Sequence, residues 1–161
     1  MAAIRRAIAS RTDFQNAIRE AFDCAARTGA REIWLCDVDY ADWPLGERAV
    51  VDALARWVHS RRRLTLVAHT FDEVARRHGR WTEWRRSWTQ SVECRTNAEL
   101  EASEVPTLCL VSDVFSVRLS DAVRHRGIVS EEPADAVACR EAFDAVLQRS
   151  VEAFPATTLG L

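Results

Sequence analysis

The chain has 161 residues, of which 48% are apolar and 29% are charged, and its formal net charge is −2. These values predict one domain over residues 1–161 and exclude a disordered or fibrous protein; flexibility is expected, if anywhere, at 1–12 and 155–161. No apolar run approaches the roughly 20 residues of a membrane span, and residues 1–10 lack the apolar core of a signal peptide. Because the five cysteines are odd in number, we expect free thiols in a cytoplasmic protein without a membrane partner.

All 22 basic residues are arginines, and lysine is absent from the sequence. This composition excludes the chemistries that need a lysine ammonium group. Among them are the phosphate-binding loop of the Walker A motif, a Schiff base with pyridoxal phosphate, and a serine–lysine dyad.

In the first half of the chain, predicted helices alternate with predicted strands. Helical apolar spacing covers residues 13–27, where Thr12 and Gln15 predict a capping box and Gly29 predicts the helix end. Short apolar runs predict strands at 33–36 and 64–68, with a weaker strand at 91–95. Between them lie a loop at 37–46, an amphipathic helix at 50–58 and a helix at 71–88 that is interrupted near Gly79.

In the second half, an acidic connector at 99–104 leads to strands at 108–111 and 114–119, paired as a hairpin, and a short strand at 127–129. A last helix begins near Pro133 and carries on one face Cys139, Phe143, Val146, Leu147 and Phe154. The order of elements predicts an α/β domain with a mainly parallel or mixed sheet flanked by helices.

Charge is distributed unevenly along the chain. The segment Arg56–Arg86 holds nine arginines and three acidic residues, an excess of six positive charges. From Glu99 to Leu161 there are eleven acidic residues and five arginines, an excess of six negative charges. The two parts either complement each other across a protomer interface or lie on solvated faces.

An acidic loop follows the first predicted strand and contains Asp37, Asp39 and Asp42. Because ligands of open parallel sheets bind beyond the carboxyl ends of the strands, these carboxylates are candidates for Mg²⁺ binding or nucleophilic catalysis. The alternative is a solvated loop in which Asp42 caps a turn. His69 ends the second strand and is a candidate general base, whereas His59, His78 and His125 are expected at the surface.

Tryptophans and arginines alternate over residues 76–88. Trp81, Trp84 and Trp88 lie at helical spacing, with the neighbouring candidate ligand-binding residues Arg80, Arg85 and Arg86. Such a segment either binds single-stranded nucleic acid or a phosphate ligand, or forms a core seam with its arginines directed outward; the spacing favours the seam. The cysteines lack the spacing of a zinc site and are expected in the core.

The order of elements and several short strings resemble the phospholipase D-like fold, and more closely a bacterial domain group related to it. The strings are DVDYADWPLG at 37–46, WRRSW at 84–88, CLVSD at 109–113, RGIVS at 126–130 and AFDAVLQRS at 142–150. The resemblance implies one copy of the phospholipase D-like half. It also implies assembly as a homodimer and association with acetyltransferase-like domains.

Active members of that superfamily carry a His-x-Lys-x4-Asp motif, in which the histidine attacks phosphorus. When Asp113 is placed on the motif's aspartate, Pro106 stands at the histidine position and Leu108 at the lysine position. Proline offers no base and leucine offers no donor to a phosphate. The resemblance therefore implies the fold without the activity.

A second resemblance is to haloacid-dehalogenase-type phosphatases. The string Trp34–Asp39 is similar to their hhhDxD signature, which implies Asp37 as nucleophile and Asp39 as acid/base, with Thr70 and Asp113 in the hydroxyl and metal-carboxylate roles. The residue after the signature is Tyr40 instead of the usual threonine.

The sequence thus leads first to a non-catalytic phospholipase D-like binding or assembly module that forms a homodimer and needs no cofactor. One alternative is a phosphohydrolase that uses Mg²⁺ held by Asp37, Asp39 and Asp113. The other is a module that binds single-stranded nucleic acid through residues 76–88, with Trp84 as a stacking residue.

Overall fold

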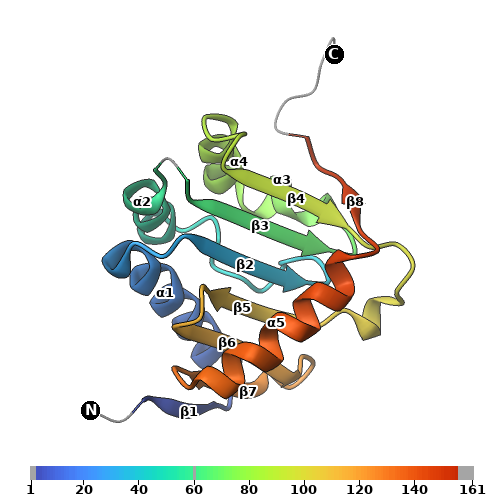
Figure 1. Ribbon diagram of the computed structural model, residues 1–161. Coiled ribbons are helices and arrows are strands. Elements are labelled where there is room, and N and C mark those ends of the chain that lie inside the picture. The colour runs from blue at the N-terminus through green and yellow to red at the C-terminus, as the bar shows by residue number, and fades with distance from the viewer. Residues whose placement is uncertain (1–2, 60, 156–161) are drawn as a thin grey trace.

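The structure, a computed structural model, describes residues 3–59 and 61–155. Its strands form one sheet in the order β1-β7-β6-β5-β2-β3-β4-β8 (Figure 1). The strands are β1 (Arg5–Ile8), β2 (Glu32–Asp37), β3 (Arg63–Ala68), β4 (Val92–Thr96), β5 (Thr107–Val111), β6 (Phe115–Asp121), β7 (Arg126–Ser130) and β8 (Val151–Glu152).

The sheet is mixed, with a parallel part and an antiparallel part. Strands β2, β3 and β4 are parallel, whereas β5 pairs antiparallel with β2, so that Cys36 lies opposite Leu108 and Ile33 opposite Val111. Strands β5, β6 and β7 form an antiparallel meander that includes the predicted hairpin. The predicted fold class, an α/β domain with a mixed sheet flanked by helices, is confirmed.

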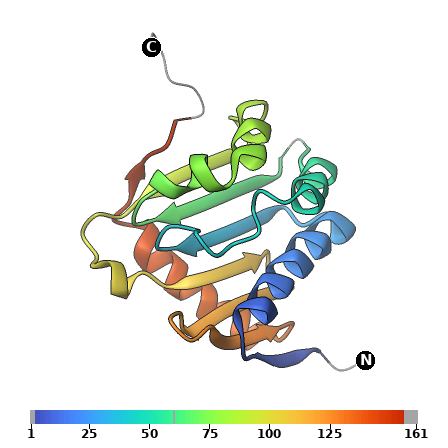
Figure 2. The ribbon, with the colours of Figure 1, turned by 180° about the vertical axis from the view of Figure 1, so that it is seen from behind.

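Helices cover both faces of the sheet. The helices α1 (Arg11–Thr28), α2 (Arg48–Trp57), α3 (Asp72–Arg77) and α4 (Gly79–Arg86) lie on the face seen in Figure 2, and α5 (Pro133–Leu147) lies on the face seen in Figure 1. The larger apolar cluster, with Phe14, Trp57 and Trp81, fills the first interface, and a smaller one with Leu108 and Phe143 lies under α5. None of the helices in the described ranges is long and apolar enough to cross a membrane.

The capping of α1 differs from the prediction at its start and agrees with it at its end. The N-cap residue is Ser10, whose hydroxyl oxygen accepts a hydrogen bond from the backbone N–H of Asp13 at 3.0 Å. Thr12 therefore lies inside the helix, and the predicted capping box with Gln15 is wrong. Gly29, with φ of 67°, ends the helix in the left-handed conformation as predicted.

Both ends of the described chain form strands that the sequence analysis did not predict. The expected flexible start contains β1, which pairs with β7. The last helix ends at Leu147, and β8 then pairs with β4, so Phe154 does not lie on the face of α5. Phe154 instead stacks on Phe71 at 5.5 Å between ring centroids. Residues 156–161, for which flexibility was expected, lie outside the described residues, whereas all five cysteines are buried and free as expected.

Candidate functional site

A groove of about 610 Å³ lies where β2 ends and β5 begins. The last residue of β2, Asp37, and the loop after it, with Asp39 and Asp42, line one side, and the β6–β7 hairpin contributes Asp121 and His125. Among the described lining residues, His125 is the single basic side chain, so we call this the acidic groove. Two of the predicted site residues, Asp37 and Asp39, are thus brought together as expected for the carboxyl end of a parallel strand.

Asp37 is the most buried of these aspartates, with 8% of its surface exposed. One carboxylate oxygen accepts a hydrogen bond from the hydroxyl of Thr107 at 2.5 Å, and the other accepts one from the backbone N–H of Tyr40 at 2.8 Å. Burial raises the pKa of the Asp37 carboxyl above its ordinary value of 3.8, although these hydrogen bonds act in the opposite direction. Asp37 therefore joins the loop to β5, and its oxygens are engaged by the protein itself.

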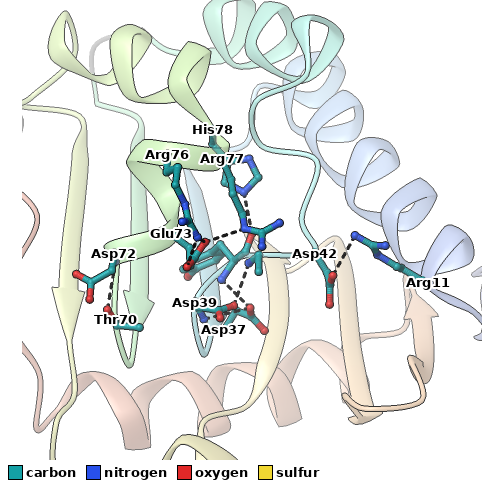
Figure 3. Close-up of polar contacts among 12 residues, drawn as sticks. Arg11, Asp37, Asp39, Asp42, Thr70, Asp72, Glu73, Arg76, Arg77 and His78 are labelled. Atoms are coloured by element: carbon teal, nitrogen blue, oxygen red, sulfur yellow. Dashed lines mark hydrogen bonds and ion pairs between the residues drawn. The ribbon is translucent and has the colours of Figure 1, made fainter.

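Buried groups fix the loop that holds these aspartates, and Figure 3 shows one of them, His78, together with Asp37, Asp39 and Asp42. Tyr40 has a φ of 61° and donates its hydroxyl hydrogen to the backbone oxygen of Val67 at 2.8 Å. His78 donates from Nε2 to the Tyr40 carbonyl at 2.7 Å and accepts at Nδ1 from the Gly46 N–H at 3.2 Å. His78 is buried, which corrects the expected surface position, and burial lowers its pKa.

Asp42 connects three elements at the rim of the groove. Its carboxylate forms an ion pair with Arg11 at the start of α1, at 3.1 Å, and lies within hydrogen-bond distance of Nε2 of His125 in the β6–β7 hairpin, at 3.3 Å. Asp39 accepts a hydrogen bond from the backbone N–H of Ala41 at 2.9 Å and is half-buried. The sequence analysis missed Thr107 and His125 as neighbours of this loop. His125 was expected at the surface, but only 17% of its side chain is exposed.

Asp113 and Asp37 lie at opposite ends of the two neighbouring strands β5 and β2. Because β5 runs antiparallel to β2, its first residue Thr107 lies beside Asp37, whereas Asp113 follows the last residue of β5. Asp113 is exposed and forms an ion pair with Arg140. The predicted set Asp37, Asp39 and Asp113 is not assembled, and within the described residues no group of three or more His, Cys, Asp or Glu side chains is placed to hold a metal ion.

His69 lines a different groove, of about 430 Å³, together with Thr70 and Asp72. Its backbone N–H donates to the Val38 carbonyl at 3.1 Å, and its side-chain Nδ1 is buried with no hydrogen-bond partner among the described residues. Neither His69 nor Thr70 lines the acidic groove. The geometry thus does not join them to Asp37 as the base or hydroxyl of one site.

Pro106 and Leu108, which the sequence resemblance places on the catalytic histidine and lysine of the motif, lie just before β5 and in the core. Pro106 directly precedes β5, and Leu108 is fully buried in the apolar cluster under α5. Between them, the Thr107 hydroxyl is bound to Asp37. A side chain at position 108 therefore contacts the core and not a ligand in the groove.

The tryptophan–arginine segment forms a core seam on one side of α4. Trp81 is fully buried, Trp84 is half-buried against the same cluster, and Trp88 is exposed. Arg85 is buried, whereas Arg80 and Arg86 are exposed, with Arg80 bound to the Gly46 carbonyl and Arg86 to Glu83. The favoured seam is confirmed for Trp81.

No family model matches the chain, and no curated protein matches it. Solved structures do match it, three of them over most of its length. Nuc from Salmonella typhimurium, a phospholipase D family member, is 12% identical with a TM-score of 0.60, over 94% of this chain and 99% of Nuc. NucT from Helicobacter pylori is 8% identical with a TM-score of 0.60, over 94% of this chain and 100% of NucT.

The third structure is TrmBL2, an archaeal chromatin protein described as having a novel mode of DNA binding. It is 12% identical with a TM-score of 0.61, over 92% of this chain, but the match spans only 54% of TrmBL2. At these identities the three likenesses show the fold, a phospholipase D-like α/β fold, which the sequence resemblance had implied.

Proposed function

We propose that this chain is a non-catalytic phospholipase D-like domain that acts as an assembly module, with a second copy of the chain as its partner. The observation that carries the proposal is the chemistry at the start of β5. By the sequence resemblance, Pro106 and Leu108 stand at the positions of the attacking histidine and the phosphate-binding lysine, and the chain contains no lysine to replace the latter. Neither residue can attack phosphorus or stabilise the negative charge on the phosphoryl oxygens.

The charge of the groove supports the same conclusion. Four aspartates line it, and its histidine is already paired with Asp42. A phosphodiester carries a negative charge, which aspartates repel, whereas phosphate-binding sites gather arginine, lysine or backbone N–H groups. The acidic groove is therefore a poor site for a phosphodiester and a better one for cationic side chains.

A magnesium-dependent phosphohydrolase receives less support from the geometry. The carboxylate of Asp37, the nucleophile that this function requires, accepts hydrogen bonds from Thr107 and Tyr40. Asp113 lies at the other end of the strands. Nucleic-acid binding through residues 76–88 is favoured by the fold shared with TrmBL2, but the burial of Trp81 and Arg85 leaves few groups for stacking. The experiment below tests the phosphohydrolase directly.

The proposed partner follows from the distribution of charge. The segment Arg56–Arg86 has an excess of six positive charges, and the part from Glu99 onward has an excess of six negative charges. In a two-fold symmetric dimer, the basic part of each subunit contacts the acidic part of the other, so both contacts form at once.

The experiment is a hydrolysis assay with two substrates. We expect no hydrolysis of bis(p-nitrophenyl) phosphate in EDTA, because the groups that catalyse metal-independent attack are missing. Hydrolysis that is lost in His125→Asn or His69→Asn would contradict the proposal and identify a relocated nucleophile.

In the second arm, p-nitrophenyl phosphate is offered with Mg²⁺. We expect no turnover above that of the Asp37→Asn variant, because the Asp37 oxygens are occupied by hydrogen bonds within the protein. Turnover in the original chain that Asp37→Asn abolishes and Asp113→Asn leaves intact would overturn the non-catalytic proposal in favour of an aspartate-dependent phosphohydrolase.

A further inference from the structure

A second groove, of about 500 Å³, lies between α4 and the strands β4 and β8 at the edge of the sheet. Its polar lining residues are Arg63, Arg85, Thr89, Glu93 and Glu152, and we call it the edge groove. It shares no lining residue with the acidic groove, although Arg63 and Arg85 belong to the basic segment Arg56–Arg86.

Arg85 is the unusual residue of the edge groove. Only 5% of its surface is exposed, and its Nε and Nη1 atoms have no hydrogen-bond partner among the described residues. The ring of Phe154 lies 4.9 Å from the guanidinium carbon and covers one side of the group. A guanidinium group stays charged in proteins, and a buried charge is normally paired. The protein thus presents a cation whose counter-ion is missing from the described chain.

The acidic residues of the groove do not supply that counter-ion. Glu93 is engaged by two other arginines, Arg63 at 3.1 Å and Arg95 at 2.8 Å. Glu152 is exposed on β8 and forms no ion pair with any residue of the described ranges. Burial lowers the pKa of Arg85, as expected for a guanidinium group that is desolvated without a nearby carboxylate.

We propose that the edge groove binds a phosphate group, either free or as a phosphomonoester, with Arg85 as its principal ligand. Two arginines, Arg85 and Arg63, line the groove beside the hydroxyl-bearing Thr89. A phosphate dianion carries two charges and several acceptor oxygens, which match two guanidinium groups and a hydroxyl better than the single charge of a carboxylate does. The aromatic ring of Phe154 restrains the guanidinium plane and so presents its N–H groups in a fixed direction.

The test is calorimetric titration of the full chain with inorganic phosphate and with phenyl phosphate, at constant ionic strength. We expect saturable binding of phosphate to the original chain and its loss in Arg85→Gln. The matched control is Arg86→Gln, which removes the same charge from the next residue, where the side chain is exposed and bound to Glu83. That control should bind phosphate as the original chain does.

A second variant keeps the proposal testable if Arg85→Gln does not fold. Arg63→Gln removes an exposed side chain, so the fold should persist, and phosphate binding should weaken about tenfold for one lost charge-assisted contact. Equal affinities for the two ligands would identify phosphate alone as the ligand, and tighter binding of phenyl phosphate would identify a monoester. The proposal is overturned if the original chain shows no saturable binding, if acetate binds equally well, or if Arg86→Gln weakens binding as much as Arg85→Gln.

Discussion

The carboxylate of Asp37 has two roles: it lines the acidic groove, and it accepts the hydrogen bonds that hold the buried turn at Tyr40. Its position directly after a strand made it predictable as a groove residue. Its partner Thr107 was not predictable, because the two residues are 70 positions apart and only the antiparallel pairing of β5 with β2 brings them together. His125 was missed for a similar reason, since it comes from the turn of a hairpin whose position over the groove is not encoded in local spacing.

The pKa of Asp37 leads to a prediction about stability and pH. Because the folded-state pKa is raised above 3.8, the folded protein binds the proton more readily than the unfolded chain does. The contribution of Asp37 to the free energy of unfolding therefore falls as pH rises from 3.8 through the folded pKa. Asp37→Asn removes this dependence while its amide can still accept from Tyr40 and donate to Thr107. Urea unfolding of both proteins over a pH series measures the difference.

The expected sign is a difference in unfolding free energy, original chain minus Asp37→Asn, that declines with increasing pH. A difference that grows with increasing pH would show that the hydrogen bonds outweigh burial and lower the pKa. Asp39→Asn, in the same loop but half-buried, is the control for effects of the loop as a whole.

Trp81 tests the core seam of α4 at the level of one side chain. It is fully buried, and removal of a buried tryptophan costs about 3–5 kcal/mol of unfolding free energy. We expect Trp81→Ala to lose stability in this range, as measured by urea unfolding. Trp88→Ala, at an exposed position of the same row, should cost far less. Equal losses of unfolding free energy in the two variants would contradict the burial of Trp81 and the exposure of Trp88.

At the scale of elements, length and periodicity decided what could be predicted. The long amphipathic helix α1 and the buried strands β2 and β3 carry clear apolar patterns, and their positions agree with the prediction. Strands β1 and β8 carry no clear apolar pattern, because β8 has only two residues and most side chains of both strands are exposed. Hydrogen bonds to β7 and β4 define these two strands, and local sequence does not report such pairing.

The pairing of β6 with β7 depends on a glycine. A Cβ atom at Gly127 would lie 2.0 Å from the backbone oxygen of Arg118 and 2.7 Å from the Cα of Leu119, next to an irregularity in the register. Since backbone atoms cannot move aside easily, we expect Gly127→Ala to lose about 1–3 kcal/mol or more of unfolding free energy.

Gly79 provides the control for that substitution. A Cβ atom there meets nothing within 4 Å, and the residue lies in α4. Gly79→Ala should therefore stabilise the protein by about 0.4–1 kcal/mol, by lowering the entropy of the unfolded chain. Thermal or urea unfolding of both variants distinguishes the two sites, and a Gly127→Ala variant as stable as the original chain would refute the close approach.

At the scale of the whole molecule, strand direction decided which candidate residues meet. The sequence placed Asp37, His69 and Asp113 at strand ends. It could not show that β5 runs antiparallel to β2, so that Asp113 lies at the other end of the strands from Asp37. The phospholipase D-like resemblance was more informative than any single constellation, because it depended on the order of elements along nearly the whole chain. The likeness of Nuc and NucT to this structure likewise extends over 94% of the chain.

The proposed assembly has a characteristic dependence on salt. Contacts between the basic part and the acidic part of two subunits weaken as the Debye length shrinks from about 10 Å at 0.1 M salt to about 3 Å at 1 M salt. A dimer held by apolar burial would show no such weakening, because salt does not screen apolar contacts. A salt series therefore separates the two causes of association.

Sedimentation velocity of the full chain at micromolar concentration, in low salt and in 1 M salt, tests the proposed assembly function most directly. We expect twice the monomer mass of 18.2 kDa at low salt and a shift toward that monomer mass at high salt. A mass of 18.2 kDa at low salt would contradict the account, and the opposite charges of the two parts would then lie on solvated faces.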